Sequence, residues 1–456
     1  MKKYFLFLFS LISFFQGISQ EQSEKVVKLI FDEALGSSVA YENLRYLCKE
    51  TKGRIAGTPQ AAAAVEFTRQ VLEEMKLDRV FLQEVMVPHW ERGNVEYGNI
   101  SSVLFGSREV PVSALGRSVG TGKEGIFGRV VEVYDFEELE KVGSEKIKGK
   151  IVFFNRPLDP TLIQTFSAYG RAANQRTSGP AMAAKYGAIG VLVRSLTHAT
   201  DNIPHTGVTR YEEGVEKIPA VSISTQGANL LSQWLKKDPD LTFHMITNCR
   251  NLPDVMSYNV VGELWGTEYP DEIITIGGHL DAWDTGEGAH DDGAGCIQSI
   301  EVLRIFRALG IKPKRTIRAV MFMDEEMGQT GGKKYAELAK INNEKHYTAL
   351  ESDRGAFTPQ GFGFGTQGER LEKMIALKKY FLPYGITEFK KGGGGVDIGP
   401  LRQFGIPLIS YIPDSQRYFY YHHSPKDTFE QVNPRELQMG SAAIAALIYL
   451  IDKYDL

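Results

Sequence analysis

The sequence predicts an α/β protein with a mixed, mostly parallel sheet, covered by helices on both faces, and an inserted second domain. Two observations carry this prediction. From residue 259 onward, short apolar β-branched runs alternate with amphipathic helical patterns, which is typical of parallel sheets in three-layer proteins. Between residues 116 and 252, closely spaced short strands replace that alternation, which indicates a separate compact unit.

The composition is that of an ordinary globular protein, with 43% hydrophobic and 24% charged residues among 456. These values exclude fibrous and disordered classes, and the length suffices for two or three domains. Lys and Arg number 52 against 56 for Asp and Glu, with no basic run, so we expect no nucleic-acid partner. Three cysteines are too few for a disulfide framework, and whether Cys48 and Cys249 pair stays open.

Residues 1–19 have the pattern of a signal peptide. A basic start is followed by a short apolar run, and Gly17 and Ser19 suit a cleavage site before Gln20. The apolar run is too short to span a bilayer comfortably, and no later stretch reaches about 18 uninterrupted apolar residues. We therefore expect a secreted or periplasmic protein without a membrane span; an uncleaved anchor is the alternative.

The main domain is expected in two segments, residues 20–115 and 253–456, on either side of an insert at residues 116–252. In the first segment, a helical pattern covers Ala61 to Met75, and strand patterns follow at Val80 to Val87 and Tyr97 to Phe105. The insert contains no catalytic cluster, so we expect it to serve structure or substrate access.

The second segment contains four buried strand patterns, each followed by polar residues. The strands are expected at Ile273 to Ile276, Thr316 to Met323, Tyr347 to Leu350 and Pro407 to Ile412. After them come, in order, His279 and Asp281; Glu325 and Glu326; Asp353; and His422 and His423. In open α/β sheets, ligands bind beyond the carboxyl ends of the strands, so these side chains are expected to converge at one edge.

The loop GGHLDAWDTGEGAHDDGAG, from Gly277 to Gly295, contains five carboxylates and neither Lys nor Arg. Buried together, these groups would repel one another unless a cation lay among them. Imidazoles together with carboxylates are the ligands expected for zinc or a similar cation. Their number exceeds what one tetrahedral ion needs, so the sequence predicts two zinc ions per chain.

The motifs GGHLDAWD, GAHDDGAG, DEEMGQTGG, ESDRGAF and HHSPKDT, in that order, resemble those of the cocatalytic-zinc exopeptidases with an aminopeptidase-type fold. That group includes the glutamate carboxypeptidases. The insert's PHTGVTRYEEGVEKIPAVSIS is similar to a protease-associated domain. The resemblance covers nearly the whole mature chain, and it implies a zinc aminopeptidase-type fold and a homodimer.

The resemblance also implies a role for each residue that matches the motifs. His279 and Asp353 would hold one zinc ion, Glu326 and His423 the other, and Asp291 would bridge them. Glu325 would be the general base that takes the proton of a water bridging the two ions and passes it to the leaving amine.

Three more residues belong to the expected site. Asp281 is placed to orient the imidazole of His279. The peptide bond between Asp291 and Asp292 is often cis in the family that the sequence resembles. Several relatives have Tyr directly before the last zinc histidine, whereas this chain has His422. Its imidazole N–H would serve in place of the hydroxyl as an oxyanion donor; a ring that only packs beside the site is the alternative.

The expected reaction is the removal of one terminal residue from short peptides or dipeptides. The sequence leaves the terminus open, because Arg354 and Arg402 favour a substrate carboxylate while spare carboxylates favour an amine. The alternatives are therefore a carboxypeptidase and an aminopeptidase. A non-catalytic receptor of the same fold would lack metal ligands, and this chain has the full set.

Overall fold

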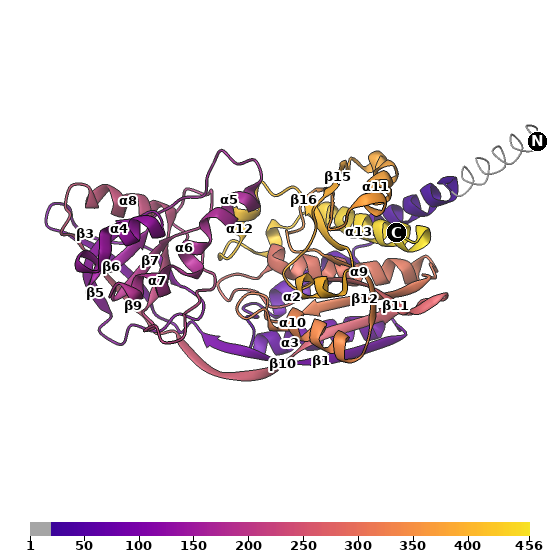
Figure 1. Ribbon diagram of the computed structural model, residues 1–456. Helices are drawn as coiled ribbons and strands as arrows, with labels where there is room; N and C mark the ends of the chain where they lie inside the picture. The colour runs from indigo at the N-terminus through magenta and orange to yellow at the C-terminus, as the bar shows by residue number, and fades with distance from the viewer. Residues whose placement is uncertain (1–19) are drawn as a thin grey trace, which may run out of the picture.

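The computed structural model describes residues 20–456, which form two parts lying side by side, each around its own sheet (Figure 1). The chain leaves the main part after strand β1 (Arg79–Glu91) and returns through its antiparallel partner β10 (Arg250–Leu264). The second part is therefore an insertion into the first. The predicted signal peptide, residues 1–19, lies outside the described residues.

The main sheet is mixed and has 8 strands in the order β1-β10-β12-β11-β13-β16-β14-β15. The strands besides β1 and β10 are β11 (Tyr269–His279), β12 (Arg315–Phe322), β13 (Lys345–Glu351), β14 (Pro359–Phe364), β15 (Glu388–Lys391) and β16 (Leu408–Pro413). The middle strands β12, β11, β13 and β16 run parallel to one another, and the antiparallel pairings lie toward the edges.

Helices cover both faces of the main sheet, as predicted. They are residues 20–36, α2 (Val39–Glu50), α3 (Pro59–Glu74), α9 (Ala294–Ala308), α10 (Thr330–Ile341), α11 (Gly368–Ala376) and α13 (Pro434–Tyr454). The short α12 (Tyr418–Tyr421) packs instead against the second part. Shorter turns of helix are η1 (Ala289–Gly293), η2 (Leu377–Tyr380), η3 (Leu382–Tyr384), η4 (Gly399–Phe404) and η5 (Phe429–Gln431).

Strand β12 shows why the sheet needs both helical layers. Its side chains alternate between the two faces, so Ile317, Ala319 and Met321 join the core under α2, α3, α9 and α13. Val320 and Phe322 point the other way and join the core under α10 and η4. Because the whole strand is buried, its sequence from Ile317 to Phe322 reads as one apolar run, interrupted by Arg318.

The second sheet also has 8 strands, in the order β3-β2-β9-β5-β6-β7-β8-β4. They are β2 (Glu96–Ser102), β3 (Gly106–Glu109), β4 (Val112–Ala114), β5 (Ile126–Val133), β6 (Ile151–Phe154), β7 (Gly190–Arg194), β8 (Ala220–Ile223) and β9 (Thr242–Thr247). The Val110 N–H, just before the end strand β4, donates to the Gly98 carbonyl of β2 at 2.9 Å, so the sheet curls back on itself.

Five helices belong to this second part: α4 (Phe136–Ile147), α5 (Thr165–Ala172), α6 (Asn174–Thr177), α7 (Gly179–Lys185) and α8 (Thr225–Leu235). Strand β6 again serves two cores. Ile151 and Phe153 pack with α8, whereas Val152 and Phe154 pack with α4 and α7.

The structure corrects the predicted boundary of the insert. Strands β2, β3 and β4 pair within the second sheet, so this part of the fold begins by Glu96 and not at residue 116. An alternating strand pattern indicates which residues face a core, but it does not indicate which sheet the strand joins. The return to the main sheet, at Arg250, lies close to the predicted end of the insert at residue 252.

The two parts are joined by an apolar contact near the candidate site. Phe166 of α5 stacks on Tyr418 and meets Phe419 edge-on, both from α12, with ring centroids 5.0 Å apart in each pair. Hydrogen bonds from Thr165 to Ser415 add to this contact.

Within residues 20–456, no helix has the length and apolar character needed to cross a membrane. The three cysteines are buried and free, so Cys48 and Cys249 do not pair.

Candidate metal centre

The candidate site lies beyond the carboxyl ends of the four parallel strands. His279 ends β11, Glu325 and Glu326 follow β12, Asp353 follows β13, His422 and His423 follow β16 by way of α12, and Asp291 lies in η1 before α9. The structure therefore brings together the side chains that the sequence predicts to converge. It does so because β12, β11, β13 and β16 are neighbours that point the same way.

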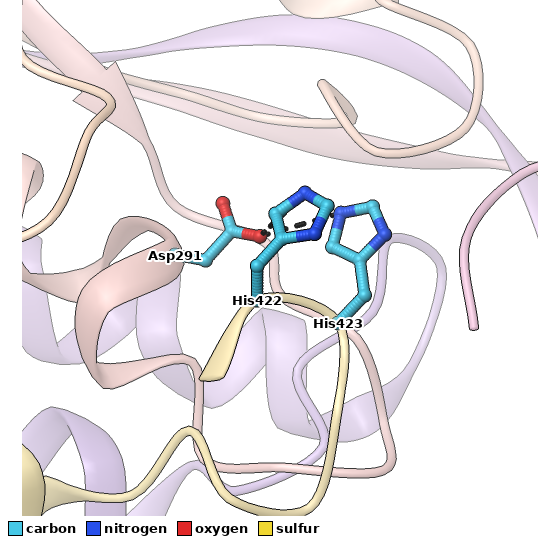
Figure 2. A group of neighbouring side chains, drawn as sticks. All are labelled: Asp291, His422 and His423. Carbon is cyan, nitrogen blue, oxygen red and sulfur yellow. Dashed lines mark ion pairs between the residues drawn. The ribbon is translucent and has the colours of Figure 1, made fainter. Parts of the chain in front are cut away.

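Asp291 lies at the centre of this group. Its Oδ1 is 3.3 Å from Nε2 of His279. Its Oδ2 is 3.3 Å from Nε2 of His423, and Figure 2 shows these two side chains. On the His279 side of Asp291, Asp353 Oδ1 lies 3.6 Å from His279 Nε2. On the His423 side, Glu326 Oε2 lies 3.1 Å from His423 Nε2. Two sets of an imidazole and a carboxylate thus share the Asp291 carboxylate.

Hydrogen bonds fix the orientation of both imidazoles. Nδ1 of His279 donates to the main-chain carbonyl of Asp281 at 2.9 Å, and Nδ1 of His423 lies 3.3 Å from the carbonyl of Thr206. Because a carbonyl accepts only, Nδ1 of His279 carries a proton, which leaves its Nε2 as the atom that can bind a metal ion. Imidazoles that bind metals are commonly held in this way. For His279 the partner is the carbonyl of Asp281, whereas the sequence pointed to its carboxylate.

The Asp281 carboxylate holds the turn after β12. It accepts hydrogen bonds from the main-chain N–H groups of Asp324, Glu325 and Glu326, at 2.8, 3.1 and 3.3 Å. Asp324 has a positive φ of 70°, a conformation that non-glycine residues adopt rarely. The buried Asp281 side chain therefore joins the end of β11 to the turn that presents Glu325 and Glu326.

Asp292 lies behind the site. The peptide bond that precedes it is cis. Its carboxylate accepts from the main-chain N–H of His279 at 3.0 Å and from that of Gly295 at 3.1 Å. A Cβ on Gly278 or Gly295 would collide with this carboxylate, which explains why both positions are glycine.

The pKa values of the buried groups show that their charges are unfavourable without a cation. Burial raises the pKa of the Glu325 and Glu326 carboxyls above their usual range, and nearby carboxylates add to the effect. Burial opposes the charge on Asp291 as well, but His279 and His423 outweigh it and hold its pKa well below the usual range. The same contacts hold the pKa of His279 well above the usual range, although burial opposes them.

Several buried carboxylate oxygens at the centre have no hydrogen-bond partner within the described chain. They are Asp291 Oδ2, Glu326 Oε1 and Asp353 Oδ1. Burying such an oxygen without a partner is costly, and a bound cation removes the cost. Three overlapping groups of side chains here have ligand atoms close enough for one ion: Asp291, His422 and His423; His279, Asp292 and Asp353; and His279, Asp291 and Glu326. Imidazole and carboxylate donors suit zinc.

His422 lies beside His423, with ring centroids 3.5 Å apart and nearly parallel planes (Figure 2). Its Nε2 is 3.8 Å from Asp291 Oδ2, and its Nδ1 has no hydrogen-bond partner within residues 20–456. Burial, with the neighbouring His423, holds the pKa of His422 well below its usual range, so the ring is neutral.

Other cations neutralise the outer carboxylates of the acidic loop. Asp284 pairs with Arg92 at 2.7 Å, and Glu287 pairs with Lys49 at 2.9 Å. The fully buried Arg54 donates to main-chain carbonyls of the same loop, those of Leu280, Glu287 and Gly288. The loop thus relies on a bound cation only at its inner end, around Asp291. Its sequence does not show this, because the three cations come from residues 49–92.

A cavity of about 870 Å³ opens over the centre, with walls from both parts of the molecule. The insert contributes Phe166, Tyr169 and Arg176, which the sequence did not mark because they belong to no motif or charged cluster. The main part contributes Glu325 and Arg354, and the Arg354 guanidinium lies over the Phe166 ring. The insert is therefore part of the candidate active site.

Known proteins resemble the chain over nearly its whole length. The sequence pattern of peptidase family M28 matches residues 259–448. The chain is 35% identical to carboxypeptidase Q of Homo sapiens over 417 residues, which cover 90% of this chain and 85% of that protein. The chain belongs to peptidase family M28. Carboxypeptidase Q of Xenopus laevis is also similar to this chain, 36% identical over 96% of this chain and 92% of its own length.

Solved structures of other proteins are similar to this chain in fold as well. An M28 peptidase precursor from Shewanella amazonensis SB2B is 33% identical, with a TM-score of 0.90 over 95% of this chain and 97% of its own. A zinc aminopeptidase from Bacillus subtilis is 19% identical, with a TM-score of 0.64 over 90% of this chain and 94% of its own. At this identity the similarity establishes a shared fold and no more. The resemblance drawn from the ordered motifs is confirmed, and this M28 protein is a metallopeptidase.

Proposed function

We propose that this protein is an exported exopeptidase that removes terminal residues from short peptides and dipeptides at a centre of two zinc ions. The observation that carries the proposal is the position of the Asp291 carboxylate. Its two oxygens face His279 and His423, each at 3.3 Å, as a carboxylate bridging two metal ions would. His279 and Asp353 would hold one ion, and Glu326 and His423 the other.

Glu325 is the proposed general base. When bound, the zinc ions supply Lewis acidity, which polarises a carbonyl and makes a water more acidic. Glu325 borders the cavity, and its main-chain N–H is held by Asp281. A carboxylate at this position can accept a proton from the attacking water and return it to the leaving amine.

His422 is the proposed oxyanion donor. Its neutral ring turns Nε2 toward Asp291, at the edge of the same cavity. An N–H from this ring would stabilise the charge that develops on the carbonyl oxygen. Asp281 and Asp292 act through the main chain, since they hold the turn of Glu325 and the N–H of His279.

Arg176 favours a substrate with a free C-terminus. Its side chain borders the cavity although it is only 5% exposed, its Nε has no hydrogen-bond partner, and no carboxylate within residues 20–456 forms an ion pair with it. A buried, unpaired cation is unfavourable by several kcal/mol, roughly, unless a ligand supplies the opposite charge. A peptide α-carboxylate matches the planar guanidinium, so we propose carboxypeptidase or dipeptidase activity. The similarity to carboxypeptidase Q agrees with this choice.

The cellular location and the assembly are also part of the proposal. We propose that residues 1–19 are removed on export, so that the mature chain begins at Gln20 in the periplasm or outside the cell. We propose a homodimer, as the resemblance implies. The mass of the mature chain, isolated from the exported fraction, tests the cleavage. Light scattering tests the dimer, and a monomeric mass would contradict it.

Hydrolysis of a dipeptide panel tests the activity. Free, N-blocked and C-amidated dipeptides are incubated with the purified protein, with and without a chelator, and zinc is then added back. We expect hydrolysis of free and N-blocked dipeptides, loss with chelator and recovery with zinc. Cleavage of C-amidated but not N-blocked dipeptides would show an aminopeptidase. Absence of both hydrolysis and bound zinc would favour a receptor-like binding protein.

A further inference from the structure

The insert holds the main chain of the two adjacent histidines. The Thr206 N–H donates to the carbonyl of His423 at 2.9 Å, and the Thr206 carbonyl lies 3.3 Å from Nδ1 of the same histidine. Next to it, Nδ1 of His205 lies 2.7 Å from the carbonyl of His422. Two consecutive residues of the insert thus contact two consecutive residues of the metal-site loop, 217 positions away.

The contact from His205 has a defined direction. The His422 carbonyl accepts only, so Nδ1 of His205 is the donor. Burial lowers the pKa of His205 to about 4, which keeps the ring neutral, and its Nε2 has no hydrogen-bond partner within the described residues. His205 is 2% exposed. The ring is therefore sealed between the two parts of the molecule, with the His422 carbonyl as its hydrogen-bond partner.

The loop that receives these contacts has an unfavourable backbone conformation at His423. His423 has a positive φ of 58°, a conformation that costs a non-glycine residue about 1 kcal/mol or more and needs support from its surroundings. The preceding helix α12 has only 4 residues and ends at Tyr421, so it gives little support. Within the loop, the N–H and hydroxyl of Ser424 donate to the Tyr421 carbonyl at 3.1 and 2.7 Å and close the turn around His422 and His423. The insert adds support from outside the loop, through His205 and Thr206.

We infer that His205 is a positioning residue for the metal centre. Through the His422 carbonyl it fixes the turn at which the chain reverses, and so directs Nε2 of His423 toward Asp291 and Glu326. The inference rests on the proposed function, since it requires a metal ion on the His423 side. It adds that the insert, besides lining the cavity, sets the geometry of a metal ligand.

The size of the effect follows from metal chemistry. Loss of a hydrogen bond that orients a ligand lowers metal affinity about 10- to 100-fold. In His205→Leu, a methyl group replaces Nδ1 and the donor is lost. In His205→Asn, the amide nitrogen is attached to Cγ, as Nδ1 is, and the donor is kept. The two variants therefore differ in the one feature that the inference requires.

The test measures zinc affinity in the full-length protein. Metal-free wild type, His205→Leu and His205→Asn are titrated with zinc against a competing chelator, and bound zinc is counted by mass spectrometry. We expect His205→Leu to bind one zinc ion about 10- to 100-fold more weakly while the other is unchanged, and His205→Asn to stay within a few-fold of wild type. His244→Asn is the matched control, because that insert histidine also contacts a main-chain carbonyl, Glu124, away from the site.

Two results would overturn the inference: wild-type zinc affinity in His205→Leu, or an affinity in His205→Asn as weak as in the leucine variant. If His205→Leu does not fold, His205→Gln takes its place, since it moves the amide one bond away, and unchanged zinc affinity there overturns the inference too. Absence of zinc binding in the wild type would instead contradict the proposed function, so the two failures are distinguishable.

Discussion

Nη1 of Arg176 lies 3.3 Å from Nδ1 of His423, although the two residues are 247 positions apart and belong to different parts of the molecule. The same nitrogen lies 3.3 Å from the Thr206 carbonyl, to which it donates. A second guanidinium nitrogen of Arg176 donates to the Tyr169 hydroxyl at 2.7 Å. A cation of the insert is thus anchored beside a proposed metal ligand, and it faces the cavity where a substrate would lie.

Replacement of Arg176 by Gln removes this cation while an amide donor remains. We expect kcat/KM for N-blocked dipeptides with a free carboxylate to fall about 10- to 100-fold, mostly through KM, because a charge-assisted hydrogen bond contributes about 1.5–3 kcal/mol. Steady-state kinetics measure the change. The control is Arg171→Gln, since Arg171 is an exposed arginine of α5. An unchanged KM would mean that Arg176 does not bind the substrate carboxylate.

Glu325→Gln separates catalysis from metal binding. We expect kcat to fall about 10²- to 10⁴-fold, because the amide takes up no proton from the water, while zinc content stays at the wild-type level. Glu326→Gln is the matched neighbour, and we expect it to lose zinc from the His423 side, where Glu326 Oε2 lies 3.1 Å from Nε2. Kinetics and metal analysis of both variants decide the assignment. Full activity in Glu325→Gln would refute it.

Removal of the metal is expected to destabilise the folded protein. Without a cation, one carboxylate oxygen of each of Asp291, Glu326 and Asp353 stays buried without a hydrogen-bond donor. An ion that binds only the folded state adds about 2.7 kcal/mol at a concentration 100 times its Kd. We expect the Tm to fall with a chelator and to recover with zinc in scanning calorimetry. Asp291→Asn should reduce this recovery, and an equal recovery would argue against a bridging role.

Arg54→Lys tests the support of the acidic loop. The lysine cannot reproduce the three bonds from Arg54 to main-chain carbonyls, so we expect a loss of about 2–4 kcal/mol in the free energy of unfolding. Urea denaturation measures it. For comparison, Arg69→Lys changes an arginine of α3 that pairs with the exposed Glu66 and Glu73, and its effect should stay within about 0.5 kcal/mol. Equal effects of the two changes would contradict this role for Arg54.

Glu344 gives a dependence of stability on acid pH that is separate from the metal site. Burial opposes its charge, but His346 and Arg318 outweigh burial and lower its pKa to about 2. Because the folded pKa lies below the unfolded value of 4.5, the group stabilises the fold above that pH and loses this effect as the pH falls toward 2. We expect Glu344→Gln to remove about 1–2 kcal/mol of this dependence, after allowance for partial exposure. Urea unfolding from pH 6 to pH 3 measures it, and parallel curves for variant and wild type would be the contrary result.

The convergence of the site could be predicted because it depends on local patterns. Each apolar run ends in polar residues, and parallel strands bring their carboxyl ends to one edge, so His279, Glu326 and Asp353 were placed together from the sequence. The ordered motifs then identified the family. The roles of Glu325 and His422 stay predictions until the variants are measured.

The sequence by itself determined the α/β class, the strands that carry the proposed ligands, and the family. It could do so because the periodicity of apolar residues in a strand and the polar residues at its end depend on residues close together in the chain. Only the tertiary structure decided that β2 to β4 belong to the second sheet, and that Arg176 and His205 of the insert reach the metal-site loop. The contacts of Arg176 and His205 join segments more than two hundred positions apart, and they depend on how the two parts pack. No local pattern specifies that packing.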